Sequence, residues 1–190
     1  MLKLTFITSN ENKYREAKET LPGLDRLGIE LPEIQSLESK EIIGPKLLAA
    51  KERVADFHDR ILLVEDASNV FEGCGRLPGT LIKYFIKELG GAPGLYKFAQ
   101  AFEVKRAVVR AVMGLLVPGQ APVFFDGEVR GQIVALRGQS KFDFDPIFQP
   151  DGFSKTFAEM TVSEKNAISH RGIALRKVRE YLQNELKWQF

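Results

Sequence analysis

The chain of 190 residues contains very little cysteine and histidine. Cys74 is the only cysteine, and His58 and His170 are the only histidines. A single cysteine excludes an internal disulfide and a cysteine-based zinc cluster, and two histidines leave little for a histidine metal site. A bound metal ion is therefore expected to be a hard cation held by carboxylates, which points to Mg²⁺, with Mn²⁺ as an alternative.

The chain also lacks a large net charge and a long hydrophobic run. The net charge is +2, which is too small to favour a nucleic-acid or membrane partner. No apolar run approaches the roughly 20 residues of a membrane span, and residues 2–8 end in polar residues, unlike a signal peptide. A cytoplasmic location is the resulting expectation.

Length and composition favour a single domain over residues 1–190 with a sizeable core, since 44% of the residues are hydrophobic. Apolar periodicity predicts helices that alternate with strands and then a β meander, which together indicate an α/β fold with a mixed sheet. Residues 107–116 are also compatible with a helix. The expected strands are 2–8, 28–33, 61–64, 106–117, 123–125 and 129–136, and the expected helices are 14–21, 46–57, 82–89, 93–102 and 168–186.

The first strand leads directly into a polar turn and a helix. Thr8, Ser9 and Asn10 form the turn, and Lys13 follows one helical turn later. The first N–H groups of a helix have no partner within the helix, and the helix dipole is positive at that end, so this segment suits a phosphate. The alternative is that Ser9 or Asn10 only caps the helix and that Lys13 is a solvated surface residue.

Two carboxylates follow predicted strands. Asp66 is expected just past the end of the 61–64 strand, and Glu33 takes an equivalent place after residues 29–31. Ligands of α/β sheets bind beyond the carboxyl ends of strands, so the two side chains could share one hard cation. The alternative is that Asp66 caps a turn and Glu33 is solvated.

Aromatic and basic residues gather in the last third of the chain. Residues 142–148 are expected to be extended, with aromatic side chains on one side that could stack on a nucleobase; the alternative is a core strand. Residues 164–171 are rich in hydrogen-bond donors near a helix start, and Arg171 could recognise a base carbonyl. The alternative there is a capped surface helix. Lys46, Lys51 and Lys83 lie on helices that could face the same cleft.

Taken in order, these segments resemble the inosine/xanthosine triphosphate pyrophosphatase family. The match extends over essentially the whole chain. It runs through Thr8–Lys13, Leu31–Gln35, Val64–Asp66, Leu77–Gly79 with Ile82–Phe85, Phe142–Gly152 with Ala158–Met160, and Glu164–Arg171.

The resemblance implies an elongated α/β protein with two lobes around a central nucleotide-binding cleft, usually a homodimer. It further implies Mg²⁺-dependent cleavage of ITP, dITP or XTP to the monophosphate and pyrophosphate, in preference to ATP. The family pattern makes Asp66 and Lys13 catalytic and makes Glu33 and Asp66 the metal ligands. The substrate-binding residues that it implies are Thr8, Asn10, Lys13, Lys46, Lys83, Phe142, Phe144, Asp145, Lys165, Ser169, His170 and Arg171.

Two positions depart from the family pattern. Ala67 follows the aspartate, where the family commonly has Ser or Thr, and Asp143 stands where the family usually has glycine. These departures keep two alternatives open: a catalytically impaired nucleotide sensor, and a Maf-type nucleotide pyrophosphatase with another base preference. A nucleic-acid-binding module is a further alternative, which the small net charge disfavours.

Overall fold

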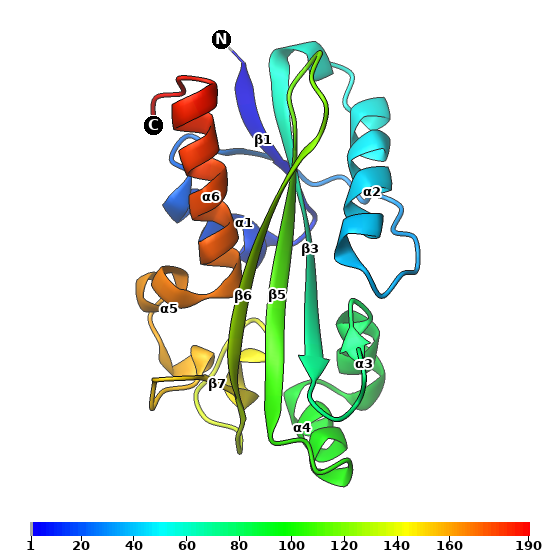
Figure 1. Ribbon diagram of the computed structural model, residues 1–190, viewed down its shortest axis with the longest axis vertical. Helices are drawn as coiled ribbons and strands as arrows, with labels where there is room; N and C mark the ends of the chain where they lie inside the picture. Colours follow the sequence, from blue (N-terminus) through cyan, green and yellow to red (C-terminus); the bar gives the residue numbers. More distant parts are fainter. Residues whose placement is uncertain (1) are drawn as a thin grey trace.

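One twisted sheet runs the length of an elongated molecule and carries helices on its faces (Figure 1). The computed structural model describes residues 2–190, in which seven strands follow the order β2-β1-β3-β5-β6-β7, with β4 paired to β3. The pairs β1–β2 and β1–β3 are parallel and the remaining pairs are antiparallel, so the predicted mixed sheet is confirmed. The strands are β1 (Lys3–Ile7), β2 (Asp25–Leu27), β3 (Arg60–Phe71), β4 (Pro78–Gly79), β5 (Arg106–Leu116), β6 (Val123–Ile133) and β7 (Phe148–Pro150).

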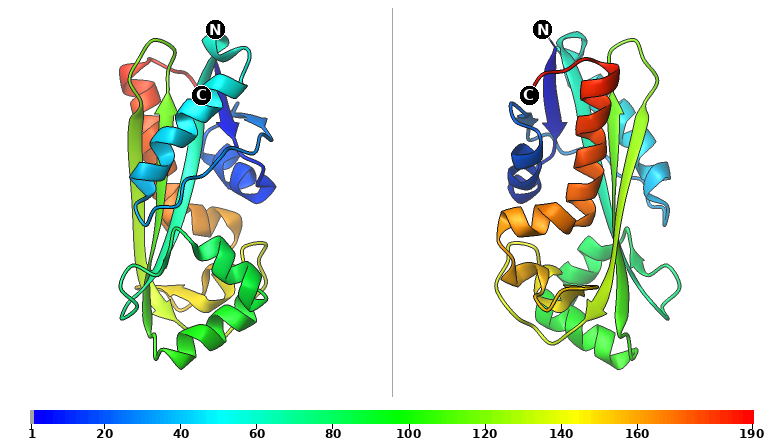
Figure 2. Two further views of the ribbon diagram at one scale, coloured as in Figure 1. Left: turned by 90° about the vertical axis from the view of Figure 1, so that its right-hand side faces the viewer. Right: turned by 60° about the vertical axis from the view of Figure 1, so that its left-hand side comes forward.

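The helices form two groups, which give the molecule two lobes (Figure 2). In the large lobe, α1 and α6 cover one face of the sheet and α2 covers the other. Successive strand residues point to opposite faces. Accordingly, Ile61 and Leu63 pack with α1 and α6, whereas Leu62 and Val64 pack with α2. The helices are α1 (Glu11–Thr20), α2 (Ser39–Arg53), α3 (Ile82–Leu89), α4 (Ala92–Ala101), α5 (Val162–Ile168) and α6 (His170–Glu185).

The small lobe is built around aromatic side chains. α3 and α4 pack there against the far ends of β3, β5 and β6, together with the 3₁₀ turns η2 (Asp145–Ile147) and η3 (Phe157–Glu159). Phe71, Phe148 and Phe157 are fully or almost fully buried in this second core. The predicted helices at 82–89 and 93–102 are confirmed as α3 and α4.

β3 is longer than the sequence predicts. It continues past the apolar run through Glu65 and Asp66 and ends at Phe71. Its pairing with β5 extends to that end, so the backbone stays in the ladder although the side chains have become polar. Asp66 therefore lies within a strand, and the expectation that it follows a strand end is wrong.

The predicted strand at 28–33 is also wrong. β2 ends at Leu27, and residues 28–38 form neither helix nor strand. Pro32 has no N–H to give to a ladder, and the carbonyl of Glu30 accepts from the Arg53 side chain instead of from a neighbouring strand. Glu33 consequently lies on an irregular loop.

The helix predicted at 46–57 begins earlier and ends earlier. α2 includes residues 39–45, so Pro45 lies in its interior. Ile42 and Ile43 on this added segment are buried against the sheet, and that burial favours the helix despite the N–H that proline lacks. The chain leaves α2 after Arg53 and makes a 3₁₀ turn, η1 (Phe57–Asp59).

The break predicted between the strands 123–125 and 129–136 does not exist, because β6 runs through Asp126 and Gly127. Gly127 pairs with Ala111 of β5, which pairs with Ala67 of β3, so three small residues cross the sheet in one row. A Cβ on Gly127 would come within 2.1 Å of the His170 carbonyl oxygen. This row therefore lets the first turn of α6 lie directly on the sheet.

Two predictions for the last third of the chain need correction. The segment 142–148 is not extended, because Asp145–Ile147 form a 3₁₀ turn that breaks the alternation of its side chains. The helix predicted at 168–186 is divided at Ser169, whose hydroxyl caps α6 by accepting from the Gly172 N–H. By contrast, the region 107–116 is a strand, β5, as primarily predicted.

Candidate active site

Two neighbouring cavities form one cleft between the lobes. The first, about 400 Å³, is called here the lysine cavity; the second, about 300 Å³, is called the aromatic cavity. Asn10, Lys13, Glu33 and Lys83 line both, so the cavities adjoin each other. The lysine cavity is also lined by Ile7, Thr8, Ser9, Ile29, Glu30, Leu31, Lys46 and Glu65.

The start of α1 forms one wall of the lysine cavity. The Asn10 side chain accepts from the backbone N–H groups of Asn12 and Lys13, and the Thr8 hydroxyl accepts from the Asn10 N–H. Asn10 thus caps the helix, as the capping alternative predicts. Lys13 differs from that alternative, because its ammonium lies 3.2 Å from Glu65 and faces both cavities.

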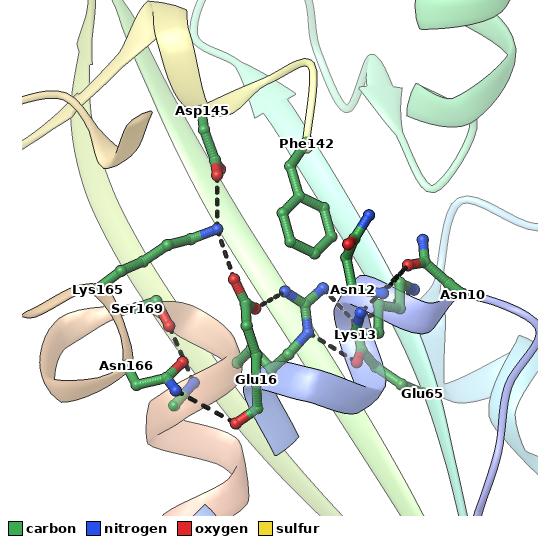
Figure 3. Close-up of polar contacts among 12 residues, drawn as sticks. Asn10, Asn12, Lys13, Glu16, Glu65, Phe142, Asp145, Lys165, Asn166 and Ser169 are labelled. Carbon is green, nitrogen blue, oxygen red and sulfur yellow. Dashed lines mark hydrogen bonds and ion pairs between the residues drawn. The ribbon is translucent and has the colours of Figure 1, made fainter. Parts of the chain in front are cut away.

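A chain of buried charges runs from Lys13 to the base of the small lobe. Arg171 donates to both carboxylate oxygens of Glu65 at 2.9 Å and to Glu16 of α1. Lys165 then joins Glu16, at 2.8 Å, to Asp145, at 2.6 Å, as Figure 3 shows. Charges of alternating sign therefore connect the lysine cavity with the aromatic cavity through five different elements of the fold, α1, β3, α6, α5 and η2.

This arrangement fixes the protonation states of its members. Burial alone would raise the pKa of Glu65, but the charges of Arg171 and Lys13 lower it well below its usual range. Burial disfavours the charged form of Arg171, yet Glu65 and Glu16 raise its pKa further. Burial raises the pKa of Asp145 in spite of Lys165. Glu65 is thus an anion and Arg171 a cation at any ordinary pH.

The irregular loop brings Glu33 between two lysines. Its carboxylate accepts from Lys46 of α2 at 2.5 Å and from Lys83 of α3. Burial would raise the pKa of Glu33, but these two hydrogen bonds lower it to about 2. Lys46 also donates to the Glu65 carbonyl at 2.9 Å, so the loop, both lobes and β3 meet at this point.

Asp66 lies next to these groups with one oxygen unpaired. Asp66 is 8% exposed, and its Oδ2 atom is buried and has no hydrogen-bond partner in the described structure. Burial raises its pKa, against the lowering influence of the nearby Ser39 hydroxyl and of the Lys13 and Lys46 charges. An unpaired buried carboxylate oxygen is costly, so this position favours a proton, a water molecule or a cation.

Asp66 and Glu33 supply part of a donor set for a hard cation. Within residues 2–190, no cluster of three or more His, Cys, Asp or Glu side chains is arranged to hold a metal ion by itself. Mg²⁺, however, is commonly bound by one or two carboxylates together with substrate phosphates and water. The unpaired Oδ2 of Asp66, with Glu33 close by, supplies such a partial set.

The aromatic cavity holds most of the remaining predicted residues. Phe142, Phe144 and Asp145 line it from the segment before β7, and His170 and Arg171 line it from α6. The Phe142 ring lies 4.3 Å from the Lys165 ammonium and 5.1 Å from the Arg171 guanidinium carbon.

His170 and Ser169 differ in their access to this cavity. Burial and the charges of Arg171 and Lys165 lower the pKa of His170 well below its usual range, so its imidazole is neutral. Its buried Nδ1 has no partner among the described residues. Ser169 is fully buried and is not among the side chains that line either cavity.

Two charged residues of the site are absent from the sequence-based prediction. Glu65 precedes Asp66, and neighbouring strand residues point to opposite faces, so alternation alone would have placed one carboxylate on each face. Glu16 lies three residues after Lys13 on α1, a spacing that puts both side chains on one helix face. Their buried pairing with Arg171, however, depends on the position of α6, which local sequence does not specify.

The amino-acid sequence is similar to that of known proteins over nearly its whole length. A model of the Ham1 family matches residues 4–181. A protein named inosine triphosphate pyrophosphatase from Puccinia graminis f. sp. tritici is 35% identical over 191 residues, covering 95% of this chain and 96% of that protein. Proteins of the same name from Batrachochytrium dendrobatidis and Schizosaccharomyces pombe are each 37% identical, with coverage of 96% or more of both chains.

Solved structures share the fold. A HAM1 protein from Coxiella burnetii superposes with a TM-score of 0.76 at 24% identity, over 96% of this chain and 99% of that one. The Staphylococcus aureus Ham1 protein gives a TM-score of 0.69 at 21% identity, over 96% and 100% of the two chains. As for membrane association, none of the helices in residues 2–190 is long and apolar enough to cross a bilayer.

Proposed function

The chain belongs to the Ham1 family, and we propose on that premise that it hydrolyses non-canonical purine nucleoside triphosphates to the monophosphate and pyrophosphate. The substrates in this proposal are ITP, dITP and XTP, and the reaction depends on Mg²⁺. One observation supports the proposal most: the cavity at the start of α1 adjoins the cavity that holds Phe142 and Phe144, and both are lined by Lys13 and Lys83. A nucleotide has the same two parts, a polyanionic tail and a flat ring.

In this proposal the triphosphate lies in the lysine cavity. Lys13, Lys46 and Lys83 line it and can pair with phosphate oxygens. Glu30, Glu33 and Glu65 line it too, so the nearly four negative charges of the tail call for Mg²⁺ in addition to the lysines. The Thr8 hydroxyl and Asn10 lie beside the positive end of α1, which favours phosphate oxygens. The phosphates compete with Glu33 for Lys46 and Lys83, which frees the Glu33 carboxylate.

The base lies in the aromatic cavity, beside Phe142 and Phe144. A guanidinium has five N–H donors, and Arg171 uses three of them on Glu65 and Glu16, which leaves two for a ligand. A 6-oxo group accepts from these donors, whereas the 6-amino group of adenine does not. A buried donor left unpaired disfavours the wrong base, so oxopurines are selected over ATP.

Asp66 is the residue proposed to activate the attacking water. Its carboxylate lines the aromatic cavity, and an oxygen that does not hold the metal ion would accept a hydrogen bond from water. Water then attacks the α-phosphorus, and pyrophosphate leaves. Mg²⁺, when bound by Asp66, Glu33 and phosphate oxygens, supplies charge neutralisation and orientation of the leaving group. Lys13 lies between the two cavities and can hold the tail in line with that attack.

The test is a nucleotide panel with purified protein, scored separately for pyrophosphate and orthophosphate. We expect pyrophosphate from ITP and XTP with Mg²⁺, much less from ATP, and little with excess EDTA. ITP that binds, as judged by a thermal shift, but yields no pyrophosphate would favour the sensor alternative. Equal turnover of ATP and ITP would contradict the base recognition, and a preference for modified pyrimidine nucleotides would favour a Maf-type enzyme. The homodimer stays a prediction that sedimentation velocity can test.

A further inference from the structure

The aromatic cavity contains a polar side chain that the proposed reaction does not use. Asn69 lies on β3, is 7% exposed and lines this cavity. None of the side-chain hydrogen bonds among the described residues involves its amide, which borders the cavity. A ligand group in the cavity can therefore pair with this amide.

The position of Asn69 is set by the alternation along β3. Glu65, Ala67 and Asn69 share one face of the strand, so Glu65, which holds Arg171, and Asn69 lie at opposite ends of the same surface. At about 3.3 Å per residue, these ends are about 13 Å apart along the strand. The small side chain of Ala67 between them leaves room for a ring.

The surroundings of Asn69 fit a base better than a sugar. Ile82 and Ile86 of α3, together with Phe144, line the same cavity, and Phe144 contacts Phe71, the next residue on that face of β3. Apolar and aromatic walls favour a flat ring over a hydroxylated ribose. Positions 2 and 6 of a purine lie on either side of N1, so a ring whose 6-oxo group faces Arg171 can direct its 2-position along β3 toward Asn69.

We propose that Asn69 is a specificity-determining residue whose amide N–H donates to a 2-oxo group on the purine. This inference rests on the proposed function. Xanthine has a 2-oxo group and hypoxanthine has only a hydrogen there, so the protein prefers XTP to ITP. Asn69 adds this second point of recognition to the first one at Arg171.

The experiment compares kcat/KM for XTP and for ITP in the wild type and in Asn69→Leu, which keeps the size and removes the amide. We expect the XTP/ITP ratio to fall about 3- to 10-fold, the effect of one neutral hydrogen bond, because only XTP loses that bond. Ser68→Ala is the matched control. Ser68 lies on the opposite face of β3 and is equally buried, so its loss leaves the ratio unchanged.

A second variant, Asn69→Asp, tests the inference in case Asn69→Leu does not fold. Aspartate has the same size but no side-chain N–H, so it places an acceptor against the 2-oxo group and lowers the XTP/ITP ratio of kcat/KM further. An unchanged ratio in both variants overturns the inference, as does a selective change for dITP or GTP in place of XTP. A wild type that releases pyrophosphate from neither ITP nor XTP overturns the proposed function, and this inference with it.

Discussion

The buried carboxylate of Glu65 offers the sharpest test of the charge network. Its side chain is 1% exposed and pairs with Arg171 through two hydrogen bonds and with Lys13 at 3.2 Å. Glu65→Gln keeps the shape but removes the charge, so it leaves the buried cation of Arg171 with Glu16 alone. Loss of one partner from a buried pair costs about 3–5 kcal/mol, and we expect the free energy of unfolding to fall by about 3 kcal/mol because Glu16 remains.

The assay is urea denaturation followed by circular dichroism, with Glu128→Gln as the matched control. Glu128 pairs with Arg110 at 2.7 Å and with Arg130 at 3.2 Å, but all three side chains are at least 35% exposed. Each exposed pair contributes about 0.2–1 kcal/mol, so the control should lose less than about 2 kcal/mol. A loss for Glu65→Gln that equals the loss for the control would refute the argument.

The dependence on pH has a definite sign. Because the folded pKa of Glu65 is lowered, its charge stabilises the fold above the pKa of an unfolded glutamate, and this contribution is lost as the pH falls toward the folded value. The difference in unfolding free energy between wild type and Glu65→Gln should therefore be complete at pH 7 and narrow below about pH 4.5, the pKa of an unperturbed glutamate. A difference that stays constant down to pH 3 would show that Glu65 acts through packing and not through charge.

Three further predictions concern the reaction and the floor of the site. Ser39→Ala removes a hydroxyl that lowers the pKa of Asp66, so the acid limb of the pH profile of kcat/KM for ITP should move to higher pH. An acid limb that does not move would show that this limb does not report the ionisation of Asp66. Gly127→Ala should lower the free energy of unfolding by about 1–3 kcal/mol in urea denaturation, because the new Cβ would meet the His170 carbonyl oxygen. The control Gly44→Ala lies at an open helical position and should be neutral or stabilising, so equal effects of the two variants would contradict the close contact. Chelation of divalent ions should abolish pyrophosphate release from ITP, and added Mg²⁺ should restore it; full activity in excess EDTA would count against a metal-dependent step.

The fold was predictable where apolar periodicity carries the signal. The runs at residues 61–64 and 107–116 and the stripe at residues 82–89 became β3, β5 and α3. The prediction was wrong where tertiary packing determines the secondary structure. Pro45 lies inside α2 because the neighbouring isoleucines are buried, and Gly127 lies inside β6 because α6 packs directly on it.

The residues of the candidate site likewise divide into those that local sequence predicts and those that depend on tertiary packing. Asn10, Lys13 and Asp66 were found from a local motif and a strand, and the structure brings them to one cleft. Glu65 and Glu16 were missed, because a buried glutamate is recognisable only once its cationic partner from a distant helix is in place. The residue separations of 106 and 155 between these glutamates and Arg171 explain why local patterns could not reveal them.

The most direct test of the account is a crystal structure of Asp66→Asn with ITP and Mg²⁺. The account predicts the triphosphate beside Lys13 and Lys46 in the lysine cavity, and the hypoxanthine ring beside Phe142 with its 6-oxo group on Arg171. A ring in the lysine cavity, or a nucleotide bound outside the cleft, would contradict it.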